Sequence, residues 1–317
     1  MSVLAGKRVL ITGGSGFLGQ HLARALLALQ PGPESVVIFS RGEHRQAEMR
    51  ETVPDARLRF FIGDVRDLER LRLAVRGVHV VIHAAALKRV DACEYDPHEA
   101  VKTNILGTAN VTQACVEAGV ERAVFISSDK AAAPLNLYGK TKACGEALWL
   151  AANAYSGGAL PMFSAVRYGN VAGSTGSVIP LWRACKHSGK PMLLTDPDAT
   201  RFWFTAAGAV ELVLSTLETM HGGELIVPEL PSFRLGDLAS ALDGTVQQVG
   251  ARNGDKSHEA MIAEEESAMF SHFQRHYVRF VLGERIGEPL PPGFAYRSDT
   301  NPQRMSVEDL RGALEQV

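Results

Sequence analysis

Short apolar runs alternate with segments of helical periodicity through the first half of the chain. Five runs rich in β-branched and aromatic residues, at 8–14, 35–41, 57–64, 79–86 and 122–128, have the length and composition of buried strands. Between them, residues 21–29, 68–75 and 105–119 carry apolar side chains at helical spacing. This alternation is typical of a parallel sheet with helices on both faces. We therefore predict an α/β fold built on a Rossmann-like, doubly wound parallel sheet.

The pattern changes near residue 171. A sixth apolar run at 162–171 extends the predicted sheet, and loops rich in Gly, Pro and Asp follow it. We expect a first domain over residues 1–170 and a smaller C-terminal α/β substrate lobe over 171–317. Residues 207–220 have a helical pattern, so we expect about 203–221 to pack back on the first domain.

A glycine-rich turn joins the first predicted strand to the first helix. Gly13, Gly16 and Gly19 stand in a GxxGxxG pattern within TGGSGFLGQ. Glycines permit a tight turn and let the backbone approach a pyrophosphate, which the helix N-terminus then attracts. A glycine turn can also be a plain strand–helix joint, but the strand before it and the helix after it favour dinucleotide binding. The other predicted contacts in this turn are Ser15, Phe17 and Leu18.

The end of the second strand bears on the choice of dinucleotide. An NAD site usually has an acidic residue here, whereas this chain has Ser40 and Arg41, with Arg45 nearby. A hydroxyl and a cation suit a 2′-phosphate, so we predict NADP rather than NAD, and the first domain as its binding domain. The alternative is a solvated basic turn.

The third and fourth strands end in further cofactor candidates. Asp64, followed by Val65, is placed to accept a hydrogen bond from the adenine amino group. The small residues Ala84 and Ala85 let a cofactor lie flat against the backbone. His83 is more consistent with a packed strand residue than with a catalyst.

Tyr138 and Lys142 begin the helical stretch that follows the fifth strand. Residues four apart lie on one helix face, and a nearby lysine lowers the pKa of a phenol. A phenolate can take the proton of a substrate hydroxyl while hydride leaves the same carbon. The alternative is an exposed pair without chemistry, but the position after five strands favours catalysis.

Asp129 and Lys130 lie just upstream, at the carboxyl end of the fifth strand, where α/β folds place ligands. This pair could be a structural ion pair. Yet a carbon next to a ketone loses its proton readily to a base, while an acid protonates the hydroxyl that leaves from the following carbon. An acid and a base beside an oxidation site therefore favour dehydration over simple oxidation.

Composition and charge narrow the function classes. The 317 residues carry a net charge of −2, so no strong basic field indicates nucleic-acid binding. No apolar stretch reaches the roughly 18 residues of a membrane span, and the four cysteines lack a metal-binding spacing. Their density is typical of reduced cytosolic thiols. We expect a cytoplasmic protein without nucleic-acid, membrane or metal partners.

The sequence resembles the extended short-chain dehydrogenase/reductases, and within them the inverting UDP-N-acetylglucosamine 4,6-dehydratases of the polysaccharide biosynthesis protein family. The matching stretches include TGGSGFLG, ISSDKAAAPLNLYGKTK, VRYGNVAGSTGSVIP and YRSDTNPQRMSVEDLR, and they run from the first strand to the last helix. The resemblance implies an NADP-dependent hydro-lyase that acts on a nucleotide sugar, with UDP-N-acetylglucosamine favoured. It also implies tightly bound NADP, inversion at C5 and a homo-oligomer.

The resemblance also implies roles for single residues. Asp129 would protonate the leaving C6 hydroxyl, Lys130 would be the base at C5, and Tyr138 with Lys142 would form the C4 oxidation pair. Further cofactor contacts are implied at Lys88, Asn104 and Val171. Substrate contacts are implied at Lys88, Asn170, Thr175, Gly176, Ser177, Val178, Arg201 and Arg252.

Several alternatives stay open at this point. A nucleotide-sugar 4-epimerase or ketoreductase needs Tyr138 and Lys142 but not the Asp–Lys pair, and a non-catalytic dinucleotide-binding regulator needs neither. Arg201 could be a stacked structural arginine, and Arg252 could be merely solvated. Residues 298–301 could form the N-cap turn of the last helix. Ala199 replaces a larger residue of the resembling family, which leaves the sugar open, and GDP could replace UDP.

Overall fold

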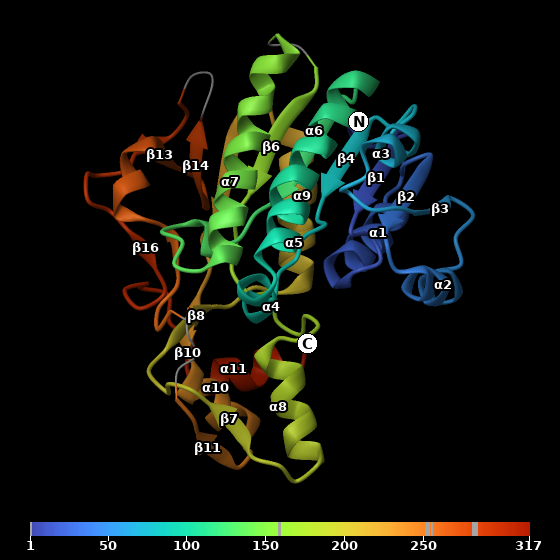
Figure 1. The fold of residues 1–317 in the computed structure, drawn as a ribbon. Helices are drawn as coiled ribbons and strands as arrows, with labels where there is room; N and C mark the ends of the chain where they lie inside the picture. The colour runs from blue at the N-terminus through green and yellow to red at the C-terminus, as the bar shows by residue number, and fades with distance from the viewer. Residues whose placement is uncertain (1, 158–159, 251–253, 255, 281–284) are drawn as a thin grey trace.

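A ten-stranded sheet dominates the computed structural model, which describes residues 2–157, 160–250, 254, 256–280 and 285–317 (Figure 1). The six strands expected from the sequence are all present and parallel, which confirms the α/β class. They are β1 (Arg8–Thr12), β2 (Ser35–Ser40), β3 (Leu58–Ile62), β4 (Val80–His83), β5 (Arg122–Ile126) and β6 (Met162–Val166). Their order is β3-β2-β1-β4-β5-β6, the doubly wound arrangement that binds ligands at the carboxyl ends of its central strands.

Four strands from the C-terminal half extend the same sheet beyond β6. They are β9 (Glu224–Pro228), β13 (Phe270–Phe273), β14 (His276–Phe280) and β15 (Glu288–Pro289). β9 pairs parallel to β6, whereas β14, β13 and β15 continue in antiparallel pairing. The sequence analysis did not predict the β13–β14 hairpin, because its strands are short and mix polar with apolar residues instead of forming an apolar run.

Helices cover both faces of this sheet. One face carries α1 (Phe17–Ala28) and α9 (Ala206–Thr219), which contact each other, and α2 (Glu43–Thr52) contacts β2 and β3. The other carries α3 (Leu68–Ala74), α6 (Gly107–Ala118) and α7 (Leu137–Ala151). Ahead of α6 lie α4 (Val90–Tyr95), α5 (Pro97–Val101) and the π-helix η1 (Lys102–Leu106).

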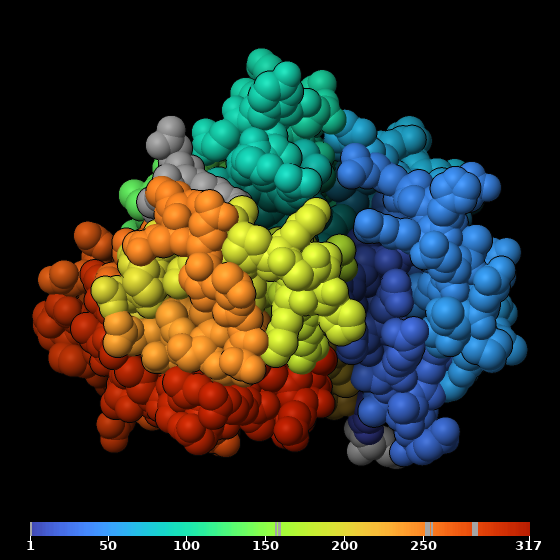
Figure 2. All heavy atoms as spheres, turned by 90° about the horizontal axis from the view of Figure 1, so that it is seen from below, coloured from blue at the N-terminus to red at the C-terminus, as the bar shows by residue number. Residues whose placement is uncertain are grey.

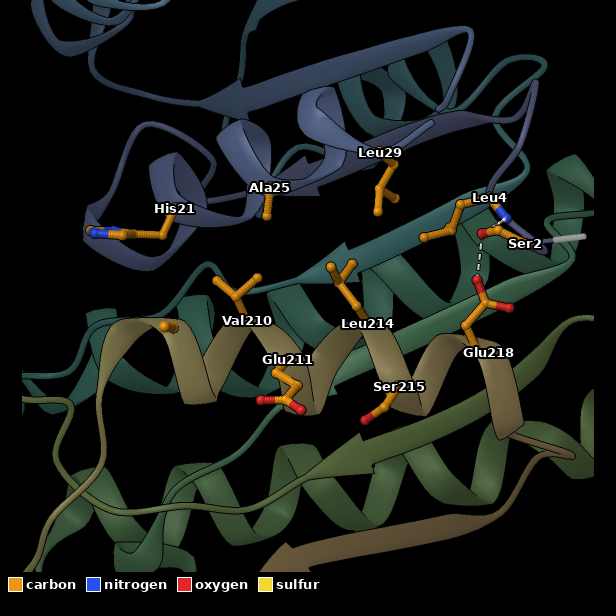
Figure 3. A pocket seen from close by; sticks show the side chains of 11 residues that line it. Ser2, Leu4, His21, Ala25, Leu29, Val210, Glu211, Leu214, Ser215 and Glu218 are labelled. Carbon is orange, nitrogen blue, oxygen red and sulfur yellow. Dashed lines mark hydrogen bonds between the residues drawn. The ribbon is translucent and has the colours of Figure 1, made fainter. Parts of the chain in front are cut away.

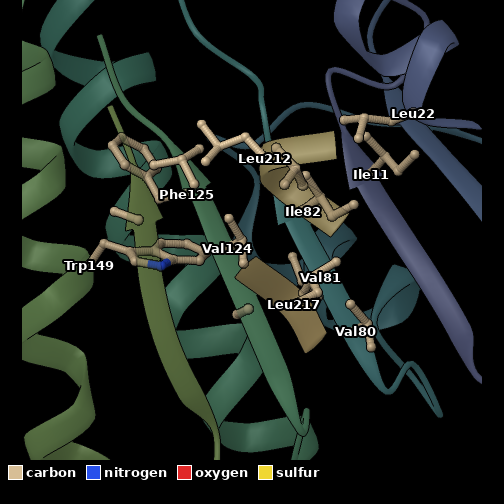
Figure 4. Packing of buried hydrophobic residues seen from close by; sticks show 14 of the residues in the cluster. Ile11, Leu22, Val80, Val81, Ile82, Val124, Phe125, Trp149, Leu212 and Leu217 are labelled. Carbon is tan, nitrogen blue, oxygen red and sulfur yellow. The ribbon is translucent and has the colours of Figure 1, made fainter. Parts of the chain in front are cut away.

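Successive side chains of β5 point to opposite faces of the sheet and pack against different helices. Phe125 packs against Trp149 of α7, while Arg122 donates to the carbonyl of Leu217 at the end of α9. Figure 4 shows the packed side chains around Val124, between these two helices. Because α9 contacts β5, β6 and α1, this helix from the second half of the chain forms part of the helical layer on the sheet of the first half.

A second hydrophobic cluster forms a smaller lobe below the sheet in Figure 1. It includes Trp182, Trp203, Phe233, Leu238 and Leu310, all buried. The elements of this region are α8 (Val178–His187), β7 (Met192–Leu194), β8 (Thr200–Phe202), β10 (Ser232–Arg234), α10 (Leu235–Leu242), β11 (Val246–Gln248) and α11 (Val307–Leu314). Residues 171–317 are thus shared between this lobe and the main sheet.

Short elements connect the two regions. They are β12 (Ala260–Ile262), β16 (Tyr296–Arg297) and the 3-10 helices η2 (Asp129–Ala131), η3 (Ala152–Ser156) and η4 (Glu264–Met269). β12 pairs with β16 and contacts η2, so the segment before β12 lies beside the carboxyl end of β5. The last helix begins at Ser306, whose side chain and that of Asp309 form a capping box. The alternative that residues 298–301 cap this helix is therefore excluded, because its N-cap is Ser306.

A surface groove lies between α1 and α9. Ala25 on α1 and Leu29 just after this helix face Val210 and Leu214 on α9, and Ser2 donates a hydrogen bond to Glu218 at the end of the groove (Figure 3). Among the described residues, no helix is long and apolar enough to cross a membrane.

A buried ion-pair cluster joins α7 to the C-terminal part of the chain. Arg167, at the end of β6, donates to Glu146 on α7 at 2.6 Å and to Glu266 in η4 at 2.6 Å. Ser127 donates to the other oxygen of Glu146, and Arg167 also donates to the carbonyl of Met261. The cluster therefore ties the predicted catalytic helix to β12 and η4.

Replacing Arg167 with methionine should destabilise the protein by about 3–5 kcal/mol, because it leaves the buried carboxylate of Glu146 and the partly buried one of Glu266 without their cation. Urea denaturation followed by circular dichroism measures the change. Arg311→Met is the matched control, since it breaks an exposed pair with Glu308 and should cost less than about 1 kcal/mol. Equal midpoints for the two variants would contradict this role of the cluster.

Candidate active site

The carboxyl ends of β1, β4, β5 and β6 meet at the edge of the sheet that faces the smaller lobe. Figure 2 looks onto this edge from below, and the yellow-green residues of the lobe lie beside the blue N-terminal segments. The hydrogen bond from Lys88, after β4, to the carbonyl of Thr175, ahead of α8, joins the two regions across the edge at 3.3 Å.

The glycine turn after β1 has the geometry of a phosphate cradle. Gly13 has a φ of 68°, and a Cβ there would lie 2.9 Å from the backbone nitrogen of Ala85. A Cβ on Gly19 would lie 2.5 Å from the backbone of Gly14, so this glycine lets α1 pack on the turn. Gly16 is the N-cap of α1 and presents the helix N-terminus. These residues fit a dinucleotide.

The end of β2 is linked to the glycine turn. Ser15 donates to the hydroxyl of Ser40 at 2.9 Å. Gln46, buried on α2, donates to the hydroxyl and carbonyl of Ser40 and to the carbonyl of Phe61. The sequence analysis missed Gln46, because the polar pattern of this helix does not mark which side chain turns inward.

The basic residues after β2 are exposed. Arg41 lies in the turn before α2, 3.8 Å from the carboxylate of Asp64, and Arg45 lies in the first turn of that helix. Arg66 donates to Asp64 at 2.6 Å. Burial raises the pKa of Asp64, but its hydrogen bonds with Arg66 outweigh burial and lower it. Any adenine contact of this carboxylate is therefore shared with an arginine that the sequence analysis did not single out.

The remaining cofactor candidates line the same edge. Phe17 and Leu18 begin α1, and Ala85 donates its backbone N–H to Thr12 at the end of β1. Val65 packs against Gly107. Val171, after β6, forms a bridge with Phe204. His83 is buried between Thr12 and Thr108, and burial lowers its pKa to about 3, as expected of a packed, neutral strand residue.

Asn104 connects the strand ends to α7. Its side chain accepts from the backbone N–H of Leu87 at 2.8 Å and donates to the carbonyl of the same residue at 2.9 Å. It also donates to Thr141, within α7, at 3.0 Å. Asn104 thus fixes the backbone next to Lys88 against the helix that carries Tyr138.

Tyr138 and Lys142 lie buried on α7, whose N-cap Asn136 accepts from the backbone of Gly139. Lys142 donates to the carbonyl of Ile126 at 2.6 Å, and burial lowers its pKa to about 7. Burial raises the pKa of Tyr138, while a hydrogen bond with Ser128 and the charge of Lys130 oppose this rise. In this geometry Lys130 is the lysine whose positive charge lowers the pKa of Tyr138, a role that the sequence analysis expected of Lys142.

Asp129 and Lys130 form the polar centre of the site. Asp129 is 1% exposed, and its carboxylate accepts from Lys130 at 3.2 Å and from Ser128 at 2.9 Å. Burial raises the pKa of Asp129, with a contribution from Glu259. Burial by itself would lower the pKa of Lys130. The carboxylates of Asp129 and Glu259 have the larger effect and raise this pKa above its usual value.

The predicted substrate residues differ in how directly they contact the Asp129–Lys130 pair. Asn170 accepts from Lys130 at 3.4 Å. Arg201 donates to the carbonyls of Thr200 and Ser257. Thr175 and Gly176 are exposed, and Ser177 and Val178 begin α8. The hydroxyl of Ser177 is buried and has no hydrogen-bond partner within the described ranges, so it can serve a ligand. Arg252 lies outside the described residues.

Two residues of the centre, Glu259 and Tyr168, were missed by the sequence analysis, which considered Ser298 only as part of a cap of the last helix. Glu259 contacts Lys130 at 3.0 Å, and Ser298 accepts from the backbone N–H of Glu259 at 2.9 Å. Tyr168 packs on Phe204, and its carbonyl accepts a hydrogen bond from the backbone N–H of Asp129. Their positions far from the Asp–Lys pair along the chain gave no local signal. Among the described residues, no group of His, Cys, Asp and Glu could hold a metal ion.

The fold is that of the extended short-chain dehydrogenase/reductases, and solved structures of this fold include nucleotide-sugar dehydratases. A DesIV dTDP-glucose 4,6-dehydratase from Streptomyces venezuelae, solved with NAD and TYD bound, matches with a TM-score of 0.72 and 25% identity over 78% of this chain and 86% of that chain. The X-ray structure of Pen from Bacillus thuringiensis matches with a TM-score of 0.91 and 32% identity over 99% of both chains.

The chain belongs to the polysaccharide biosynthesis protein family, whose model matches residues 9–280. A UDP-N-acetylglucosamine 4,6-dehydratase (inverting) from Campylobacter jejuni is 42% identical over 96% of both chains. A UDP-glucose 4-epimerase from Rickettsia rickettsii is 36% identical over 86% of this chain and 82% of the relative. The family expected from the sequence is thereby confirmed, and the names of these two relatives correspond to the two candidate activities.

Proposed function

We propose that this protein is an NADP-dependent nucleotide-sugar 4,6-dehydratase that acts on UDP-N-acetylglucosamine and inverts C5. The observation that carries the proposal is the contact between Asp129 and Lys130, 3.2 Å apart at the carboxyl end of β5, in the η2 turn that packs against the α7 helix of Tyr138. The Campylobacter relative supports this activity by its name. A homo-oligomer and a cytoplasmic location remain predictions.

Tyr138, as its phenolate, starts the reaction by accepting the proton of the C4 hydroxyl, which it later gives up to solvent. A dinucleotide held by the glycine turn after β1 would supply the hydride acceptor for C4 and the hydride donor for C6. The adjacent ketone makes the C5 proton acidic, so that Lys130 can remove it. The electron pair of this C–H bond forms the C5–C6 double bond, the C6–O bond breaks, and Asp129 protonates the leaving hydroxyl to give water.

The proton balance of the site suits this elimination. In the resting site the proton lies on Lys130, because two carboxylates raise its pKa. Transfer of that proton to Asp129, whose pKa burial raises, gives a neutral base and a protonated acid without any exchange with solvent. Elimination returns the pair to its resting state. A solvent proton then adds to C5 on the face opposite to Lys130, which inverts this carbon.

The other residues would hold the two ligands. Gly13, Gly16 and the N-terminus of α1 would bind the pyrophosphate, and Ser40 with Arg41 would bind the 2′-phosphate. Asn170, Arg201 and the loop from Thr175 to Val178 would contact the nucleotide sugar. The hydroxyl of Ser177, buried and without a hydrogen-bond partner among the described residues, supports a ligand at this loop.

Purified protein incubated with UDP-N-acetylglucosamine and no added cofactor tests the proposal. Mass spectrometry should find a nucleotide sugar lighter by one water. A product of unchanged mass but altered sugar would instead favour the second candidate, a nucleotide-sugar 4-epimerase, which the Rickettsia relative supports by its name. Parallel incubations with GDP- and dTDP-sugars test the choice of nucleotide.

Arg41→Asp should weaken NADP binding about tenfold or more, because it removes a charged hydrogen-bond donor from the 2′-phosphate. When the protein without substitutions is denatured, mass spectrometry of the released dinucleotide should identify NADP. Titration of the cofactor-stripped protein and its variant with NADP measures the change in affinity. Arg76→Asp, an exposed substitution ahead of β4, is the control. Release of NAD from the native protein would contradict the proposed selectivity.

A further inference from the structure

We propose that Glu259 is a positioning residue for the elimination, fixing the Lys130 side chain and adding a second negative charge beside the ammonium that forms when Lys130 takes the C5 proton. This inference rests on the proposed dehydration. It assigns a role to a residue 129 positions away from Lys130 along the chain.

The geometry around the Lys130 ammonium supports this role. Its nitrogen lies 3.0 Å from Glu259 Oε1, 3.2 Å from Asp129 Oδ1 and 3.4 Å from Asn170 Oδ1. An ammonium has three N–H donors, so these three acceptors match its capacity. Because Asp129 adjoins Lys130 in the chain, Glu259 is the acidic partner that fixes the lysine from the opposite segment.

Glu259 is itself held independently of Lys130. Its backbone N–H donates to the hydroxyl of Ser298, and its carbonyl accepts from the backbone N–H of the same serine, both at 2.9 Å. Lys256, three residues earlier, donates to the carbonyl of Ala132 just after η2. The segment before β12 is thus anchored to both the smaller lobe and the loop after Lys130.

The second carboxylate oxygen of Glu259 points to a role beyond ion pairing. The residue is 2% exposed, and Oε2 has no hydrogen-bond partner in the described part of the chain. A buried acceptor without a donor is costly, and hydroxyl groups of a bound sugar are donors of the kind it needs. Arg201, a predicted substrate residue, lies 3.8 Å from the other oxygen.

The charges that face Glu259 predict how its loss would act. Lys130, Arg201 and Lys256 lower its pKa against the effect of burial, and Asp129 is the other carboxylate at the lysine. Removing the charge of Glu259 makes every proton on the Asp129–Lys130 pair easier to lose. Both limbs of the pH–rate profile for water loss should therefore move to lower pH.

The test compares Glu259→Gln and Glu259→Asp with the native protein, using UDP-N-acetylglucosamine and mass spectrometry across a pH series. In Glu259→Gln, water loss should fall roughly tenfold to hundredfold, less than the largest losses for an acid or base itself. Its profile should shift by about one pH unit or more to lower pH. Glu259→Asp keeps the charge, so its rate should fall while its profile stays near that of the native protein.

Glu265→Gln is the matched control, because it removes the same charge from an exposed position in η4. Its rate and profile should equal those of the native protein. An unchanged rate in Glu259→Gln, or a lower rate with an unshifted profile, would overturn the inference while leaving the dehydration intact. Absence of water loss in the native protein would instead overturn the proposed function on which the inference rests.

Discussion

Replacing Lys130 with methionine should stop the loss of water while the C4 hydroxyl is still oxidised. Methionine keeps much of the side-chain volume but cannot accept the C5 proton, so we expect water release to fall about 10²–10⁴-fold. Tyr138 and Lys142 lie on a separate element, α7, and keep their side chains, but loss of the Lys130 charge raises the pKa of Tyr138, so the oxidation should slow without stopping. Mass spectrometry of a quenched reaction should detect a sugar ketone two hydrogens lighter than the substrate.

The control for this variant is Lys140→Met, an exposed lysine on α7. It should dehydrate the substrate at the native rate. Circular dichroism of both variants tests whether Lys130→Met folds despite the two carboxylates left beside it. Native water loss in a folded Lys130→Met protein would remove this lysine from the elimination.

Tyr138→Phe should block the reaction one step earlier. The phenylalanine ring can keep the packing against Cys93 and Ala100, but it lacks the oxygen that accepts the C4 proton. We expect conversion to fall about 10²–10⁴-fold, with neither the sugar ketone nor the dehydrated product formed. Tyr95→Phe, which removes an exposed hydroxyl, is the control. A ketone that still accumulates in Tyr138→Phe would assign the C4 proton to another group.

The sequence predicted the layers of the fold because the buried strands carry their own signal. β1, β2, β4 and β5 are continuous apolar runs, as expected of strands that are covered on both faces, and the glycine turn after β1 marks where that strand ends. The edge strands β13 and β14 are short and partly polar, so their pairing depends on contacts with β9 that no local pattern records.

The site was predictable where one segment carries the chemistry and unpredictable where distant segments meet. Asp129, Lys130, Tyr138 and Lys142 lie within one stretch, and spacing alone places the last two on one helix face. Glu259 reaches Lys130 only because β12 packs against η2 and pairs with β16. Burial also shifts the pKa values of these groups, and the sequence alone does not show which side chains the folded chain buries.

The most direct test of the account uses UDP-N-acetylglucosamine with deuterium at C4, in ordinary water and without added cofactor. Internal oxidation, elimination and return of the same hydride predict a product that has lost one water and carries the deuterium at C6. Nuclear magnetic resonance locates the label. Deuterium returned to C4 of a sugar that keeps all its oxygens would contradict dehydration and establish an epimerase.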